Sequence, residues 1–327
     1  MSEDAMAGVF RPEPVIRLSR DMRAAAVALG DEEARFLVSS YYNLQGHRIA
    51  SGNQVKAIER GGGDVPHSVL LWLAAQNQTL EDQVKGALDV YTRGHAVGAW
   101  LRGQVGVGPV LAAGLLAHLD IKEHGATVWK WYRFAGLDPT SRWEKGQKRP
   151  WNAELKRVCW LLGESLCKVS GREGAFYGKL YRLRKAYETR LNESGAYREQ
   201  AEARLRTRAP GGDTVARKAL EAGRLPLGQI HERSKRYAVK MLLSGLHMVW
   251  HWEEHGRLPH LPFAVGRDRG TGGGHMTAIA AHGIDGALAQ ACAAAGYISG
   301  DAALEHVMAY WKVGPEALVV PERPEDG

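Results

Sequence analysis

Residues 105–113 read Val-Gly-Val-Gly-Pro-Val-Leu-Ala-Ala and lie between two apolar stretches, 97–101 and 111–119. Two glycines separated by one residue favour a tight turn, because glycine adopts backbone conformations that a side chain would hinder. Pro109 stands at the first position of a following helix, where its missing N–H is not needed. The stretch therefore predicts two short apolar helices joined by a hairpin.

The rest of the chain has the same helical character. Apolar residues recur at helical spacing, and no strand-like alternation precedes the hairpin. The predicted fold class is all-α, a multi-helix bundle that contains a helix-hairpin-helix motif. Helices are expected over 31–59, 69–75, 80–101, 129–134, 152–169, 175–206, 230–252, 278–297 and 302–311.

Breaks in this pattern divide the chain into four regions. We expect a disordered tail over 1–20, an N-terminal helical domain over 21–100, the hairpin with a basic helical region over 101–208, and a C-terminal helical region over 209–327. The last boundary lies at the turn sequence Ala-Pro-Gly-Gly, and the last region includes a glycine-rich loop at 266–274.

The composition is that of an ordinary globular protein. Of 327 residues, 45% are hydrophobic and 24% are charged, which excludes a wholly disordered chain. No apolar run approaches the ~18 residues of a membrane span, and the N-terminus lacks the apolar core of a signal peptide. Cys159, Cys167 and Cys292 form no CxxC pair, which argues against a disulfide framework or a zinc ribbon. We therefore expect a cytoplasmic protein without a membrane partner.

Positive charge is concentrated in one segment. Residues 142–185 contain twelve Lys or Arg and four Glu, a net charge of +8, whereas the whole chain carries +7. The remainder of the chain is thus close to neutral. Such clustering favours a polyanionic partner, although a solvated helical face can carry the same run.

The hairpin itself has the features of a helix-hairpin-helix that binds the DNA backbone. Gly106, Val107 and Gly108 would present backbone N–H groups to a phosphate, and the second helix would add its positive N-terminus. Contacts of this kind carry no base code. The alternative is a glycine-containing turn between helices with no ligand.

A basic loop follows at 140–150. Its charges would pair with phosphates, and its tryptophans offer flat surfaces for stacking on a base. The predicted DNA-binding residues here are Arg142, Trp143, Lys145, Lys148, Arg149 and Trp151. Helical positions further along the chain add Lys156, Arg157, Arg233, Arg236 and Lys240. The alternative is that the tryptophans belong to the core and the charges are merely solvated.

Three motifs in this region resemble a known family. They are Gly-Val-Gly-Pro-Val-Leu-Ala-Ala-Gly-Leu-Leu-Ala at 106–117, Ala-Gly-Leu-Asp-Pro at 135–139 and Lys-Gly-Gln-Lys-Arg at 145–149. Together they are similar to the C-terminal module of the DEDD transposases of the insertion-sequence-110 group, relatives of the Piv DNA invertase. The matching stretch runs from about residue 101 to 168. The resemblance implies DNA contact and an origin in a phage or mobile element.

Two features of that family are missing here. The family carries an N-terminal RuvC-like domain with metal-binding acidic residues, whereas roughly a hundred residues of helical character precede the hairpin in this sequence. The family also has a serine, implicated in strand transfer, before the glycine of the basic loop. Lys145 precedes Gly146 here, and the nearest serine is Ser141. The leading hypothesis is an accessory protein that holds duplex or branched DNA, as a homo-oligomer or beside a separate nuclease subunit.

Two other functions are considered. An enzyme that processes DNA or modifies its bases would use Asp138 or Glu144 as catalytic groups, and it requires both to converge with a histidine in one cleft. His247, His251 and His255 are spaced to share one helical face and are weak candidates for a divalent metal, since no HExxH pattern occurs. The last alternative is a helical protein-interaction module, which predicts no salt-sensitive DNA affinity.

The N-terminal half contains one further candidate. Tyr41, Gln45 and Arg48 share one predicted helical face, with Asn53 and Gln54 about a turn beyond. This polar-aromatic set would either contact nucleic acid or pack against the C-terminal helices.

Overall fold

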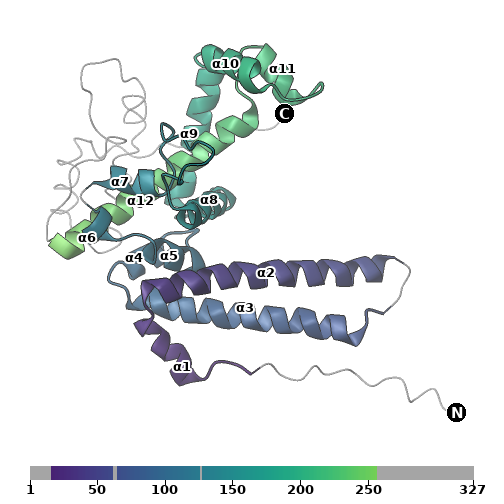
Figure 1. Ribbon diagram of the computed structural model, residues 1–327, viewed down its shortest axis with the longest axis vertical. Helices are drawn as coiled ribbons and strands as arrows, with labels where there is room; N and C mark the ends of the chain where they lie inside the picture. The colour runs from purple at the N-terminus through teal and green to yellow at the C-terminus, as the bar shows by residue number, and fades with distance from the viewer. Residues whose placement is uncertain (1–15, 62–64, 126, 256–327) are drawn as a thin grey trace. The chain divides into compact units, whose positions relative to one another are not determined.

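The computed structural model describes residues 16–61, 65–125 and 127–255. Within these ranges all regular structure is helical, with twelve α-helices, one 3-10 helix and no strand (Figure 1). The all-α class is confirmed for this part of the chain. None of its helices combines the length and the apolar character needed to cross a membrane. Outside the described residues lie positions 1–15 of the tail expected over 1–20, the loop at 266–274, the helices over 278–297 and 302–311, and Cys292.

The helices divide between two compact units. The first unit contains the described residues up to 98 together with 108–118, and the second contains 99–107 and 119–255. The end of the first stretch lies close to the boundary expected at residue 100. Helices on both sides of residue 208 belong to the second unit.

The first unit is built on two long antiparallel helices, α2 (Asp31–Arg60) and α3 (Ser68–Gly94), which lie side by side (Figure 1). The sequence predicted two helices in place of α3, with a break at 77–79, and this was wrong. The polar residues there include no glycine or proline, and the Gln78 amide donates to the Asp82 carboxylate one turn later (3.0 Å). Side-chain bonds at this spacing support a continuous helix.

The end of the predicted helix over 80–101 also needs correction. The chain leaves helical geometry at His95 and then forms a separate short helix, α4 (Gly98–Gly103). Glycines at positions 94 and 98 weaken helical continuity there, because glycine loses more backbone freedom in a helix than other residues do.

A buried carboxylate joins α2 and α3. Glu81 on α3 accepts hydrogen bonds from Arg48 (Nε to Oε2, 2.5 Å) and from Gln45, which also donates to the Tyr41 hydroxyl. Burial opposes ionisation of Glu81, but hydrogen bonds from Arg48 and Tyr41 outweigh it and hold the pKa of this carboxyl below its ordinary value. Tyr41, Gln45 and Arg48 therefore join α2 to α3 within the first unit.

Three shorter elements complete the first unit. α1 (Arg20–Ala25) and η2 (Ala26–Ala28) pack on α3, and α5 (Pro109–Leu116) packs on both α2 and α3. The Ser19 hydroxyl caps α1 by accepting a hydrogen bond from the Met22 amide (3.1 Å). α5 is apolar throughout, which suits a helix that is buried on several sides.

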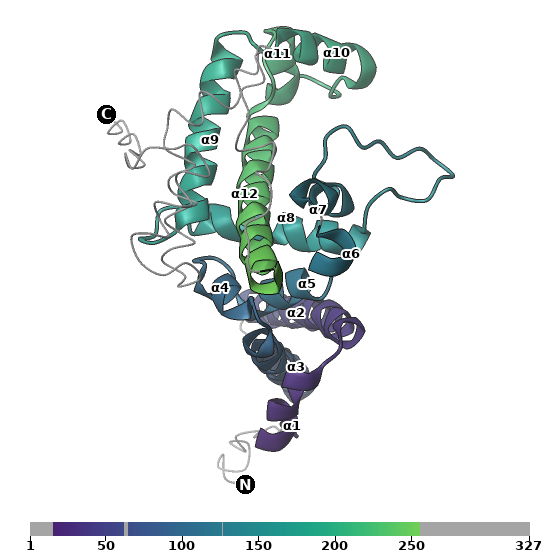
Figure 2. The same cartoon turned by 90° about the vertical axis from the view of Figure 1, so that its left-hand side faces the viewer.

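The second unit is organised around its longest helix, α12 (Leu227–His255). α9 (Phe176–Glu193) packs along it and α8 (Ala153–Lys168) crosses it (Figure 2). The approach of α9 is close, because a Cβ placed on Gly245 of α12 would lie only 2.5 Å from the Tyr177 hydroxyl oxygen. The middle of α12 is consequently buried on all sides.

Two short helices pack against the second half of α12. They are α6 (Ile121–His124) and α7 (Val128–Phe134). The buried Tyr132 hydroxyl on α7 donates to the Lys240 carbonyl of α12 (3.0 Å) and also contacts the Ser244 hydroxyl. These bonds fix α7, and with it the turn that follows α7, relative to α12.

The single helix predicted over 175–206 is in fact two. α9 ends at Glu193, and α10 (Arg198–Arg208) begins after Gly195, whose φ of +84° is a left-handed conformation that favours glycine. A further short helix, α11 (Val215–Glu221), was not predicted.

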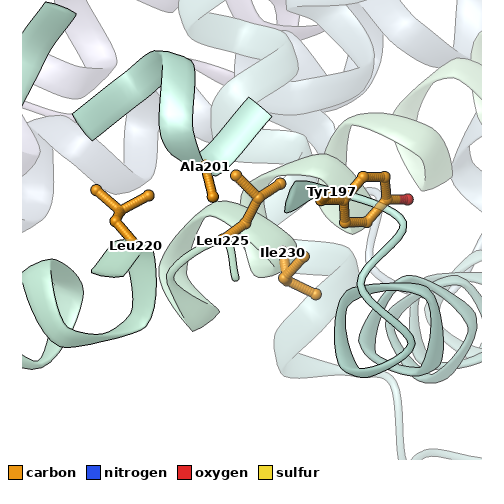
Figure 3. Close-up of a cluster of buried hydrophobic side chains, with 5 residues drawn as sticks. All are labelled: Tyr197, Ala201, Leu220, Leu225 and Ile230. Carbon is orange, nitrogen blue, oxygen red and sulfur yellow. The ribbon is translucent and has the colours of Figure 1, made fainter. Parts of the chain in front are cut away.

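The break after α9 directs an aromatic side chain into a small apolar cluster. Figure 3 shows the cluster, which consists of Tyr197, Ala201, Leu220, Leu225 and Ile230. Asn192, near the end of α9, supports it by donating to the Leu225 carbonyl (2.9 Å) and accepting from the Leu225 amide (2.8 Å). A helix continued through the break would separate Tyr197 from its partners on α11 and α12.

Candidate nucleic-acid interface

The two glycines of the hairpin sequence adopt different conformations. Gly106 has a φ of +100°, and a Cβ there would lie 2.9 Å from Val169 Cγ2, so this turn requires glycine. Gly108 has an ordinary extended conformation (φ −82°, ψ 173°) with open space beside it, and it is the N-cap of α5. Pro109 occupies the first helical position, as the sequence predicted.

The backbone of this turn already makes internal hydrogen bonds. The Val107 N–H donates to the Gln104 carbonyl (2.9 Å), and the Ser165 hydroxyl donates to the Gly106 carbonyl (2.6 Å). Apart from its first residue α4 belongs to the second unit, whereas α5 belongs to the first. The turn and the start of α5 are thus observed, and the paired arrangement of a helix-hairpin-helix stays a prediction.

The loop between α7 and α8 extends away from the helices (Figure 2). Its predicted DNA-binding cations are all exposed, and none forms an ion pair with any residue that the structure describes. These cations are Arg142, Lys145, Lys148 and Arg149. Trp143 is 46% exposed, and its indole N–H donates to the Gln147 carbonyl (2.7 Å), while Arg149 lies over its ring. Trp143 is therefore a surface residue and not part of the core.

Trp151 lies half-buried where this loop joins α8. The Lys156 ammonium is 3.9 Å from the centroid of its ring, which is a cation–π contact. Gly136, with a φ of +63°, also approaches the Trp151 ring closely, since a Cβ there would lie 2.9 Å from Trp151 Cγ. Asn152 caps α8 as predicted, and Arg157 is exposed on the first turns of that helix.

A pocket of about 400 Å³ opens beside this loop, between α8, α12 and the turn after α7. We call it the α8–α12 pocket. Three of the candidates predicted from the sequence line this pocket, namely Asp138, Lys156 and Arg236. Its charged and aromatic lining consists of Asp138, Lys156, Trp160, Glu232, Lys235 and Arg236.

Asp138 is used by the turn that forms one wall of the pocket. Its carboxylate accepts hydrogen bonds from the Thr140 amide (2.9 Å), the Thr140 hydroxyl (2.7 Å) and the Ser141 hydroxyl (3.2 Å). Burial opposes ionisation, but the Thr140 and Ser141 bonds outweigh it, so the pKa of Asp138 lies below its ordinary value. A carboxylate held ionised in this way is a poor proton donor near neutral pH, and the turn accounts for it.

Arg236 lies close enough to two lysines, Lys240 and the pocket residue Lys156, to repel both. Desolvation and then the charge of Arg236 lower the pKa of Lys240 to about 8, with Asp138 partly opposing the shift. Desolvation, then the charges of Arg236 and Arg149, lower the pKa of Lys156. Neither Lys156 nor Arg236 forms an ion pair with a described residue. An anion bound here would relieve the repulsion.

Arg233, three residues before Arg236 on α12, has a different environment. Its Nε donates to Glu188 Oε2 (3.0 Å), and its guanidinium lies over the Tyr197 ring. Glu188 is 1% exposed and also accepts from Arg184 (Nε to Oε1, 2.8 Å) and from the Tyr197 hydroxyl (2.6 Å). The charge of Arg233 therefore neutralises a buried carboxylate, and its role is explained without DNA.

Sequence analysis missed the role of Lys235, which is 4% exposed. Its ammonium donates to Glu232 (2.6 Å) and to Glu164 on α8. With His231 these carboxylates form the one group in the described ranges whose potential metal-ligand atoms all lie within 4.8 Å of one another, but Lys235 already supplies a cation to both carboxylates. The one feature of the sequence that could have indicated this contact is Gly163, because a glycine on α8 allows α12 to approach closely at Lys235.

The three histidines of α12 lie along one face, as predicted. The ring centroids of His247 and His251 are 5.9 Å apart, and those of His251 and His255 are 4.5 Å apart. His247 is buried and donates from Nε2 to the Gly125 carbonyl (2.7 Å), and burial lowers its pKa to about 4. These histidines do not form a close group of metal-ligand atoms among the described residues.

Glu144 does not line the α8–α12 pocket. It is exposed in the loop, where it accepts a hydrogen bond from Gln147 (3.2 Å). The α8–α12 pocket is lined by Asp138 but by neither Glu144 nor a histidine. The convergence that the enzyme hypothesis requires is thus not found in the part of the chain that the structure describes.

Comparisons with protein-family models, with curated proteins and with solved structures find no match to this chain. The loop and the α8–α12 pocket therefore provide the basis for inferring a ligand.

Proposed function

We propose that this chain binds the phosphate backbone of DNA through the basic loop between α7 and α8 and the adjoining cations of the α8–α12 pocket. The observation that carries the proposal is the lack of carboxylate partners for these cations within the described residues. Two other cations of the unit, Arg233 and the pocket residue Lys235, are instead neutralised by glutamates.

The loop is suited to electrostatic contact that is independent of sequence. Its cations project from a segment of backbone rather than from a packed helix face, and Trp143 offers an exposed aromatic surface among them. A protein that neutralises several phosphates releases condensed counterions, so its affinity falls steeply as salt increases. Backbone contacts alone would hold duplex or branched DNA without reading bases.

The hairpin would add a second backbone contact in this proposal. The conformation of Gly106 and the proline-started helix after Gly108 support it, since both are what a phosphate-binding turn needs. Together with the resemblance to transposase C-terminal modules, this favours an accessory DNA-binding protein of a phage or mobile element. Bond breaking would then be the task of a separate nuclease subunit.

The test is DNA binding by fluorescence anisotropy at several salt concentrations, with duplex, single-stranded and branched DNA. The variant Lys145→Gln/Lys148→Gln removes two exposed loop charges, and we expect it to reduce the salt dependence by about two ion equivalents. The matched control is Lys56→Gln/Lys85→Gln, which removes two exposed charges from the first unit. Absence of salt-dependent binding, or equal losses in both double variants, would overturn the proposal.

The hairpin is tested separately with Gly108→Glu. This position has open space and an ordinary φ, so a side chain there should leave the fold intact while its carboxylate repels a phosphate. Gly106→Glu is unsuitable, because its side chain would collide with Val169. Unchanged affinity in Gly108→Glu would remove the hairpin from the interface and leave the loop.

A further inference from the structure

The α8–α12 pocket has the dimensions of a small-ligand site. Its volume of about 400 Å³ lies within the range of roughly 300–1,000 Å³ that ligand pockets occupy. The turn after α7 that lines it, through Pro139 and Ser141, continues directly into the basic loop. A strand of DNA held on that loop would therefore pass the pocket.

The three cations that line the pocket differ in their pairing. Lys235 is neutralised by Glu164 and Glu232, and the Asp138 carboxylate is satisfied by its turn. Lys156 from α8 and Arg236 from α12 form no ion pair with a described residue, although the charge of Glu232 partly opposes the lowering of the Arg236 pKa by desolvation. Two cations that face one space from different helices form a site for a single anionic group such as a phosphate.

The pocket also has an aromatic wall. Trp160 follows Lys156 by one helical turn on the same side of α8, and it is 54% exposed. The Lys235 ammonium lies 5.5 Å from the centroid of the Trp160 ring. The exposed part of the indole offers a surface on which a base can stack, and base–aromatic stacking tolerates any base. One turn of helix spans roughly 5–6 Å, which is comparable to the distance between the phosphate and the base of one nucleotide.

We propose that the α8–α12 pocket binds one unpaired nucleotide of a DNA strand, with its phosphate between Lys156 and Arg236 and its base against Trp160. The inference rests on the proposed function, because the loop delivers the strand. The nucleotide must be unpaired, since neighbouring bases cover both faces of a base inside a duplex.

The experiment compares a blunt duplex with the same duplex carrying a single-stranded overhang, by fluorescence anisotropy with the full chain. We expect the overhang to bind at least about fivefold more tightly, and Trp160→Ala or Lys156→Gln to abolish this preference. The matched controls are Trp129→Ala and Lys168→Gln, which alter an exposed tryptophan and an exposed lysine outside the pocket and should retain it. Thermal unfolding of each variant checks the fold.

Competition separates a nucleotide site from a simple anion site. Deoxyadenosine monophosphate should remove the preference for the overhang, and inorganic phosphate at the same concentration should not. Equal affinity for the blunt and overhanging duplexes, or equal competition by phosphate, would overturn this inference while leaving the proposed DNA binding in place.

A further measurement applies if the chain does not bind DNA at all. If neither duplex binds, calorimetric titration with deoxyadenosine monophosphate examines the pocket alone. Binding that is lost in Trp160→Ala would then support a nucleotide pocket without DNA binding by the loop, and no binding would overturn both.

Discussion

Two regions along α12 gather positive charge in different ways. At the Glu188 cluster, near the start of the helix, Arg233 and Arg184 surround a buried carboxylate that also accepts from Tyr197. At the α8–α12 pocket, one turn further along, Arg236 and Lys156 line one space, and neither forms an ion pair with a described residue. The first arrangement stabilises the fold, whereas the second opposes it and has room for an anion. A count of basic residues does not distinguish the two.

The largest effect should come from removing the carboxylate of the Glu188 cluster. Glu188→Gln leaves two arginines without their counter-charge in a buried site, and breaking such a pair costs about 3–5 kcal/mol of the unfolding free energy. Denaturant-induced unfolding measures this loss. Glu193→Gln is the control, since Glu193 is exposed at the end of the same helix and should change the unfolding free energy by less than about 0.5 kcal/mol. Similar losses in both variants would contradict the structural role of the cluster.

A smaller difference should separate two arginines on one helix. Arg233→Gln removes a charged hydrogen bond to Glu188, so we expect the unfolding free energy to fall by about 1–3 kcal/mol. Arg236→Gln removes a cation that forms no ion pair within the described ranges, and we expect a change within about 0.5 kcal/mol together with weaker DNA binding. If Arg236→Gln destabilises the protein as much as Arg233→Gln does, the contrast between the two regions is wrong.

The smallest effect is a dependence of stability on pH that comes from Lys240, a neighbour of Arg236 on α12. The pKa of Lys240 is about 8 in the folded protein and 10.5 when unperturbed, so between these values the unfolded chain holds a proton that the folded chain has released. The unfolding free energy should therefore rise with pH in this window, by about 1 kcal/mol between roughly pH 7.5 and pH 9.

Denaturant-induced unfolding at these two pH values measures the rise. Lys240→Met should remove this rise in unfolding free energy, because methionine does not titrate. If the unfolding free energy of Lys240→Met still rises between these pH values, another titrating group causes the rise.

The sequence predicted the elements whose signals are local. The cap at Asn152, the helix start at Pro109 and the apolar spacing of α2 and α12 depend on residues within a few positions of one another. The errors arose where local signals competed with packing. A polar stretch at 77–79 suggested a break that the pairing of α3 with α2 does not require, and the helix after Phe176 is interrupted so that Tyr197 joins a distant cluster.

The candidate site was predicted only in part. The loop cations and the tryptophans beside them were selected from charge and aromatic content, and the structure leaves the cations exposed. The part played by Lys235 and Trp160 could not be read from the sequence, because it depends on the crossing of α8 and α12 at Gly163.

Helical structure in the described ranges and the concentration of positive charge in one segment could both be predicted from the sequence, because helix periodicity and charge are properties of neighbouring residues. Which of those charges are neutralised depends on how the helices pack. Glu188 and Arg233 are 45 positions apart, and Glu164 and Lys235 are 71 positions apart. Ion pairing depends on distance in space, so the cations that form no ion pair with a described residue are identified only when the helices are packed.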